Sequence, residues 1–161
     1  MKYKISVFCD TSFFVRLLDK NDALCTNAKG YFRYFTENKF NLMISTIAIA
    51  EYCIRGNYDD LPVKKLLTVT YDLDHALRTS EFARIAFQAR QNNKLQVNDR
   101  NIIPNDTKLF AQADCAKADY YITSDSKSVK VYNAIKEKTD IKFQFIDLNT
   151  PYNQTFGVLD L

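Results

Sequence analysis

The stretch ISVFCDTSFFVRLL, residues 5–18, contains a strand pattern followed at once by a helix pattern. Residues 5–9 are rich in β-branched and aromatic side chains and are near-continuously apolar, which is typical of a strand covered on both faces of a parallel sheet. From Ser12 onward, a hydroxyl residue that can cap a helix is followed by large apolar residues at helical spacing. We therefore predict a strand over 5–9 and a helix over 12–20, with Asp10 at their junction.

The same alternation continues along the rest of the chain. Further strand patterns lie at 42–46, 67–71, 120–124 and 143–147. Further helix patterns lie at 22–38, from Ser45 or Thr46 through Cys53, and at 61–67, 79–92, 106–118 and 126–138. Alternating strands and helices predict an α/β fold with helices on both faces of the sheet. Residues 92–105 are expected to form a loop, and residues 149–161 a C-terminal tail after a single domain over 1–148.

Composition narrows the class of protein further. With 161 residues and 47% apolar side chains, the chain can bury the core of one domain. The only glycines are Gly30, Gly56 and Gly157, which excludes the glycine-rich phosphate loops of P-loop and Rossmann proteins. One histidine and four cysteines without a CxxC pair disfavour a zinc site. The net charge of +3 is too small to identify a polyanionic partner by itself.

The distribution of cysteines and apolar residues favours a cytoplasmic location. Scattered cysteines in apolar surroundings fit a reducing compartment. The apolar run near the N-terminus is interrupted by Asp10 and Arg16, and no small-residue cleavage pattern follows, so we expect no signal peptide. No segment approaches the roughly 20 apolar residues that a membrane crossing requires. We therefore expect a cytoplasmic protein without a membrane partner.

Four acidic residues stand at or near the junctions between the predicted strands and helices. Asp10 closes the first strand pattern, Asp125 closes the run YYITSD, Asp106 opens a helix pattern, and Glu51 lies inside the apolar helix pattern STIAIAEYCI. In a parallel α/β sheet, strand ends meet helix starts along one edge, where ligands bind. Four carboxylates gathered there would repel one another unless a cation joined them, and hard oxygen ligands select Mg²⁺ or Mn²⁺. The pattern thus predicts a hydrolytic metal site.

Each of these acids also has a purely structural explanation. The three aspartates stand where helix capping, the helix dipole or a turn favours Asp. Glu51 could form a surface ion pair with Arg55, four residues further along the helix. Glu51 is nevertheless the most informative of the four, because its neighbours in sequence are apolar and a carboxylate in such surroundings is rarely buried without a partner.

Four segments resemble the motifs of PIN-domain nucleases of the VapC-like toxin type: FCDTSFFVRLL, ISTIAIAEYCIRG, NDTKLFAQADCAKADYYITSD and FQFIDL. In that family an acidic ligand follows the first strand (here Asp10), a glutamate lies on a helix (Glu51), and an aspartate opens a later helix (Asp106). An Asp or Asn then closes a strand after a Thr-x pair (Asp125). The residues 117–119 and the approach IIPND depart from the usual pattern without touching these positions.

The resemblance, which spans roughly residues 4–148, implies a fold and a set of partners. The expected fold is a three-layer α/β/α sandwich around a five-stranded parallel sheet of strand order 3-2-1-4-5. The family acts on RNA, and many of its toxins form homodimers and are held inactive by a small antitoxin protein.

The resemblance also implies roles for individual residues. Asp10, Glu51 and Asp106 would hold one Mg²⁺ or Mn²⁺ ion, and Asp125 would act through water or on a second ion. Neighbouring hydroxyl residues are candidates to orient ligands or water: Thr11, Ser12, Thr123 and Ser124. Nearby basic residues are candidates to contact RNA phosphates: Arg16, Arg55, Lys108, Lys127 and Lys130.

The predicted function is therefore a divalent-metal-dependent endoribonuclease, with a role as the toxin of a toxin–antitoxin pair. The alternative is a catalytically inert PIN-like module that binds RNA or a protein partner. A third alternative, an aspartyl-phosphate phosphatase or receiver, would need a second acid beside the nucleophilic aspartate. The sequence Asp10-Thr11-Ser12 lacks that acid.

Overall fold

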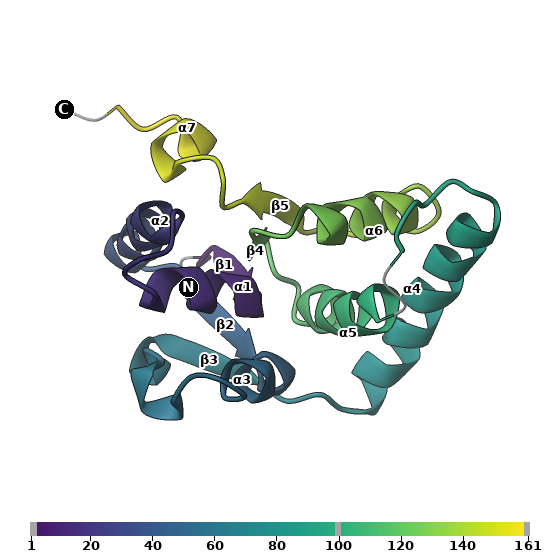
Figure 1. Cartoon of the computed structure of the whole chain (residues 1–161), viewed down its shortest axis with the longest axis horizontal. Coiled ribbons are helices and arrows are strands. Elements are labelled where there is room, and N and C mark those ends of the chain that lie inside the picture. The colour runs from purple at the N-terminus through teal and green to yellow at the C-terminus, as the bar shows by residue number, and fades with distance from the viewer. Residues whose placement is uncertain (1–2, 99–100, 160–161) are drawn as a thin grey trace.

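The computed structural model describes residues 3–98 and 101–159, whose strands form one sheet (Figure 1). The strands are β1 (Ser6–Cys9), β2 (Asn41–Ser45), β3 (Leu66–Val69), β4 (Tyr120–Thr123) and β5 (Gln144–Asp147). Their order in the sheet is β3-β2-β1-β4-β5, and every neighbouring pair is parallel. The five-stranded parallel sheet and its predicted order are thereby confirmed. Because the strands are parallel, their carboxyl ends lie along the same edge.

Helices follow the strands in alternation, as the sequence predicted. They are α1 (Thr11–Leu18), α2 (Cys25–Glu37), α3 (Thr46–Tyr52), α4 (Leu73–Gln91), α5 (Ile102–Cys115), α6 (Ser126–Lys136) and α7 (Tyr152–Phe156), with the 3₁₀ turns η1 (Tyr58–Asp60) and η2 (Val63–Lys65). No helix in the described ranges combines the length and apolar character that a membrane crossing requires.

Two hydrophobic cores lie on opposite faces of the sheet, because successive side chains of a strand point to opposite faces. Val7 and Cys9 of β1 belong to the core that packs against α1 and α2, whereas Phe8 between them belongs to the core that packs against α4, α5 and α6. Figure 1 shows α4, α5 and α6 grouped on one side of the sheet and α1 and α2 on the other. The predicted α/β/α layering is therefore confirmed.

The helix predicted over 106–118 is α5, and it begins at Ile102 rather than at Asp106. Pro104 lies in the first turn of α5, where a backbone N–H has no acceptor within the helix, so the proline costs no helical hydrogen bond. The Asn105 N–H donates to the Asn101 carbonyl at 3.0 Å. Residues 102–105 are thus helical instead of part of the predicted loop, while residues 99–100 of that loop lie outside the described residues.

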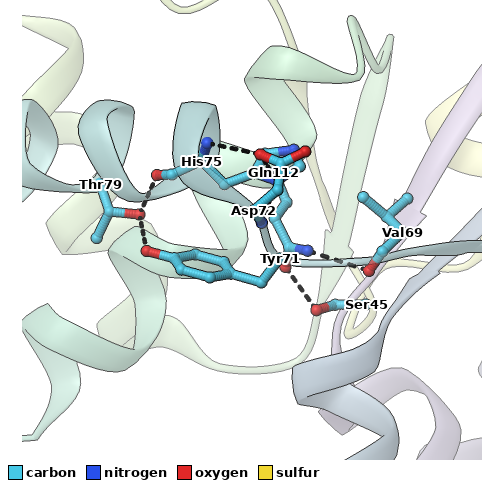
Figure 2. Close-up of polar contacts among 7 residues, drawn as sticks. All are labelled: Ser45, Val69, Tyr71, Asp72, His75, Thr79 and Gln112. Atoms are coloured by element: carbon cyan, nitrogen blue, oxygen red, sulfur yellow. Dashed lines mark hydrogen bonds and ion pairs between the residues drawn. The ribbon is translucent and has the colours of Figure 1, made fainter.

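Two further boundaries differ from the predictions. α4 begins at Leu73 rather than at residue 79, because Asp72 accepts from the His75 backbone N–H and the His75 Nδ1 atom accepts from the Asp72 N–H (Figure 2). This reciprocal cap uses histidine where glutamate or glutamine is usual. The short helix predicted over 61–67 is replaced by η2, and Leu66 already belongs to β3.

The segment 149–161, expected to form a tail, contains α7, which packs on α2. The Tyr31 hydroxyl donates to the Thr150 carbonyl at 2.6 Å and lies 2.6 Å from the Thr155 hydroxyl. Phe156 stacks on Tyr34 with ring centroids 4.7 Å apart. The α7 segment therefore completes the core on the α2 side of the sheet.

Tyr31→Phe is expected to lower the free energy of unfolding by about 1–2 kcal/mol, because it removes the partly buried hydrogen bonds of the Tyr31 hydroxyl to the Thr150 carbonyl and the Thr155 hydroxyl. Urea denaturation would measure the change. The matched control is Tyr34→Phe, since the Tyr34 hydroxyl makes no hydrogen bond within the described residues and only its ring packs. Equal losses in the two variants would contradict a contribution from the Tyr31 hydroxyl.

Candidate active site

The structure brings the four predicted acids to one cavity at the carboxyl edge of the sheet. Asp10 directly follows β1, Asp125 lies two residues after β4, and Glu51 and Asp106 are on α3 and α5. The cavity has a volume of about 260 Å³. Its lining consists of Asp10, Thr11, Ser12, Glu51, Asn101, Ile102, Asn105, Asp106, Leu109 and Asp125. Four acids from separate parts of the chain thus share one cavity.

Asp10 is buried at the base of this arrangement, with only 8% of its surface exposed. One carboxylate oxygen accepts from the Ser12 backbone N–H at 2.9 Å and caps α1. The other accepts from the Ser12 hydroxyl at 3.1 Å and from the Thr123 hydroxyl. Burial raises the pKa of Asp10, the hydroxyl and N–H donors lower it in part, and the charge of Glu51 raises it. The Asp10 side chain therefore both caps α1 and lines the cavity.

Glu51 is half-buried on α3 and accepts a hydrogen bond from the Thr11 hydroxyl. The ion pair with Arg55 that the sequence left open is not formed: within residues 3–98 and 101–159, no ion pair joins these two side chains. Glu51 thus lines the cavity, and no basic side chain of the described part of the chain forms an ion pair with it.

Asp106 has surroundings that disfavour its charged form. Its Oδ2 atom is buried and makes no hydrogen bond within the described residues. The pKa of Asp106 is raised to about 7, first by burial and then by the negative charges of Asp10 and Asp125, with a smaller contribution from Glu51; the nearby Ser128 hydroxyl acts in the opposite direction. Because Asp106 is in the second turn of α5, the alternative that it serves as a helix cap is wrong. Within the described residues, no basic side chain forms an ion pair with this carboxylate.

Asp125 lies at the exposed side of the cavity. Its side chain accepts from the Lys127 backbone N–H at 2.9 Å and caps α6, and its own N–H donates to the Thr123 hydroxyl at 3.1 Å. The capping alternative for Asp125 therefore holds alongside its position in the cavity wall. Because its carboxylate is exposed, Asp125 could contact a metal ion through a bound water, which is the role expected for it from the sequence.

The hydroxyl residues predicted to orient the site form a connected layer beneath the acids. Thr11 donates to Glu51, while Ser12 and Thr123 both donate to Asp10 and lie 3.3 Å from each other. Ser124 contributes its backbone N–H, which donates to the Ser12 hydroxyl at 3.0 Å. Three of the four side chains thus contact carboxylates directly, and the fourth residue acts through its backbone.

The donor set of the cavity fits Mg²⁺ or Mn²⁺. All four acids supply hard oxygen ligands, and the unpartnered Asp106 oxygen with its raised pKa marks a place where a cation would relieve electrostatic repulsion. Among the residues that the structure describes, no group of three His, Cys, Asp or Glu side chains is close enough together to hold a metal ion. The open arrangement suits Mg²⁺, which keeps several water ligands and binds substrate phosphate.

The predicted RNA contacts differ in how available they are. Arg16 forms an ion pair with Asp22 and is the weakest of the five candidates, because its guanidinium is already neutralised. Arg55 lines an apolar groove beside Glu51. Lys127 and Lys130 are exposed on α6, and Lys108 is half-buried on α5. Arg55 is exposed as well, so Arg55, Lys127 and Lys130 are the candidates most accessible to a polyanion.

Four lining residues were missed in the sequence: Asn101, Ile102, Asn105 and Leu109. Asn101, Ile102 and Asn105 belong to the stretch predicted to be a loop. Leu109 lies about one helical turn after Asp106. The signal that could have found them is the helical spacing of Ile102, Asp106 and Leu109, which becomes visible once Pro104 is placed in a first turn.

No protein-family model and no curated protein sequence matches the chain. Solved structures do. The chain is similar to VapBC2 from Rickettsia felis bound to a DNA fragment from its promoter, with 14% identity over 89% of this chain and 100% of that chain and a TM-score of 0.57. It is similar to DNA-bound VapBC from Salmonella typhimurium, with 16% identity over 89% and 98% of the two chains and a TM-score of 0.56.

A third solved structure is VapC20 from Mycobacterium tuberculosis, a toxin that cleaves the sarcin-ricin loop. It is 16% identical to this chain over 76% of this chain and 92% of its own, with a TM-score of 0.51. The chain has a PIN-like fold. The resemblance found in the sequence is thus confirmed at the level of architecture, and the PIN-like fold places the carboxyl ends of β1 and β4 beside α3 and α5. What the fold does chemically depends on the residues at that edge.

Proposed function

We propose that this PIN-like protein is a divalent-metal-dependent endoribonuclease that hydrolyses phosphodiester bonds in the four-acid cavity and serves as the toxin of a toxin–antitoxin pair. The observation that carries the proposal is the gathering of Asp10, Glu51, Asp106 and Asp125 from four elements around one cavity. An RNA substrate is supported by the sarcin-ricin loop cleavage named for VapC20, and an antitoxin partner by the VapBC complexes.

The arrangement of side chains explains how the cavity would promote hydrolysis. Attack on a phosphodiester adds negative charge to the phosphoryl and leaving oxygens, and a bound Mg²⁺ or Mn²⁺ supplies charge neutralisation and a more acidic water. Asp10, Glu51 and Asp106 would hold the ion, with Asp125 acting through water. The hydroxyls of Thr11, Ser12 and Thr123 fix the direction of the carboxylates before substrate arrives, which avoids reorganisation during the reaction.

The accessible basic residues would orient the RNA. Lys127 and Lys130 lie on α6 just beyond Asp125, where they can contact phosphates that flank the scissile bond. Such contacts are electrostatic and independent of base sequence, so cleavage should weaken as salt concentration rises. A homodimer and a small antitoxin protein complete the proposed set of partners. The inert alternative is less well supported, because all four acids remain available in one cavity.

The test is cleavage of a mixed RNA pool by the full chain with Mn²⁺ or with excess EDTA. We expect cleavage with Mn²⁺, complete loss in EDTA, and recovery when Mn²⁺ is restored, because the acids cannot neutralise the developing charge alone. Cleavage that persists in excess EDTA would contradict metal dependence. Calorimetric titration with Mn²⁺ separates the inert alternative: a protein that binds no Mn²⁺ and cuts no RNA would favour that reading.

A further inference from the structure

A buried amide links the helix that carries Asp106 to the strand end that precedes Glu51. The Gln112 side chain, on α5, has 0% of its surface exposed, as has Ser45 at the end of β2. Figure 2 shows Gln112 reaching both Ser45 and Val69. Its Oε1 atom accepts from the Ser45 hydroxyl, and its Nε2 atom donates to the Val69 carbonyl at 3.1 Å.

The orientation of this amide is determined by its partners. The Val69 carbonyl can only accept, so the nitrogen of Gln112 must face it and the oxygen must face Ser45. Ser45 and Val69 are paired in the register of β2 and β3, at the carboxyl ends of both strands. Gln112 therefore attaches α5 to two adjacent strand ends at once.

The same link reaches the helix that carries Glu51. The Ser45 hydroxyl accepts from the Ile47 backbone N–H at 2.9 Å and so caps α3 while it donates to Gln112. Glu51 lies six residues after Ser45, and Asp106 lies six residues before Gln112, each about 9 Å along its helix. One short chain of hydrogen bonds thus joins the start of α3 to the last turn of α5.

Within the described residues, α3 and α5 make few direct contacts with each other. α5 packs mainly on α4 and α6, and α3 packs mainly on α1 and β2. The distance between Glu51 and Asp106 is therefore set through the sheet edge, where Gln112, Ser45 and Val69 meet. A buried polar group is costly unless it is hydrogen-bonded, and here the Gln112 oxygen, the Gln112 nitrogen and the Ser45 hydroxyl each have a partner.

We propose that Gln112 is a positioning residue that fixes the spacing of Glu51 and Asp106, so that the cavity binds a divalent cation with its acids already in place. The inference rests on the proposed metal-dependent activity and assigns to it a residue that does not touch the cavity. Through its hydrogen bond with Ser45, Gln112 positions α3 and therefore Glu51. Through its own place on α5, it positions that helix and therefore Asp106.

The test compares Gln112→Met with wild-type protein by calorimetric titration with Mn²⁺ and by the Mn²⁺ concentration that gives half-maximal RNA cleavage. Methionine has a similar length, but its sulfur is only a weak acceptor for the Ser45 hydroxyl and it has no donor for the Val69 carbonyl. We expect Mn²⁺ affinity to fall about 10- to 100-fold, the range typical of partners that orient metal ligands, and the half-maximal Mn²⁺ concentration to rise in parallel.

The matched control is Tyr132→Phe. The Tyr132 hydroxyl, on α6, donates a buried hydrogen bond to the Phe143 carbonyl at 2.7 Å. Tyr132→Phe removes this bond, which is not part of the Gln112 link. Its Mn²⁺ affinity should equal that of wild-type protein even where its melting temperature falls. Ser45→Ala provides a second variant in case Gln112→Met does not fold, and in the double variant the two losses should be less than additive, because both break one link.

The outcomes separate this inference from the proposed function. Wild-type protein that binds Mn²⁺, together with Gln112→Met and Ser45→Ala variants that bind it equally well, overturns the positioning role alone. Wild-type protein that binds no Mn²⁺ overturns the proposed function and the positioning role with it. Weakened binding in both variants, with unchanged binding in Tyr132→Phe, supports the inference.

Discussion

Asp10→Asn is expected to lower the rate of RNA cleavage by at least about 100- to 1,000-fold, the loss seen when one preorganised electrostatic group is removed from an active site. The amide has the size of the carboxylate but lacks its charge, so it cannot hold a divalent cation or balance the charge of the metal with Glu51 and Asp106. Asparagine is also a good helix N-cap, so its oxygen can still accept from the Ser12 N–H and α1 should be retained. Single-turnover cleavage at saturating Mn²⁺ would measure the loss.

The control for this prediction is another capping aspartate. Asp72 caps α4 in the way that Asp10 caps α1, yet its side chain is exposed and does not line the four-acid cavity. Asp72→Asn should cleave RNA at the wild-type rate. Glu51→Gln should lose activity as Asp10→Asn does, while circular dichroism shows both variants folded. Full activity in Asp10→Asn or in Glu51→Gln would rule out the proposed roles of these carboxylates.

Asp106→Asn is expected to stabilise the metal-free protein at alkaline pH. The pKa of Asp106 is about 7 in the folded protein against an ordinary value of 3.8, so the folded state binds this proton more tightly than the unfolded chain does. The stabilisation that the proton provides is complete below about pH 4 and is lost as the pH rises through about 7. Above pH 7 the wild-type protein therefore carries an unfavourable buried charge that asparagine removes.

The size of this stabilisation and its disappearance at low pH can both be measured. In EDTA at pH 8, urea denaturation should show Asp106→Asn to be more stable than wild-type protein by on the order of 2–4 kcal/mol, whereas at pH 4 the difference should vanish. At pH 8, Mn²⁺ at a hundred times its Kd should raise the free energy of unfolding of the wild-type protein by about 2.7 kcal/mol. The same Mn²⁺ concentration should leave the free energy of unfolding of Asp106→Asn unchanged. A stability difference that is independent of pH would refute the link between burial, charge and the Asp106 proton.

The sequence predicts the fold well because its strand patterns are local. The runs 5–9 and 120–124 are apolar enough to be recognised without knowledge of their neighbours, and the rule that parallel strands share a carboxyl edge then places Asp10 and Asp125 together. Glu51 stands out by its apolar surroundings in the sequence. The presence of all four acids around one cavity is therefore visible from segment order, while the cation itself remains a prediction.

The remaining features depend on contacts that no local pattern contains. The Gln112 link joins residues 67 positions apart in the chain, so an amide within an apolar helix gives no hint of its partner. The early start of α4 depends on a histidine in a capping role, and the start of α5 on a proline placed where a helix tolerates it. α7 is short, and it is held by α2 rather than by its own helix propensity.

The hydrogen bond between Asp10 and Thr123 spans 113 residues and has a consequence for synthesis on the ribosome. β1 is the central strand, and its neighbour β4 is made long after β1 has left the exit tunnel. At typical translation rates the interval is roughly 10 s, during which Asp10 lacks its hydroxyl donor from β4 and the wall formed by α5 is incomplete. A nascent chain therefore cannot assemble the four-acid cavity until most of its length has emerged, because Asp106 and Asp125 lie in the later part of the chain.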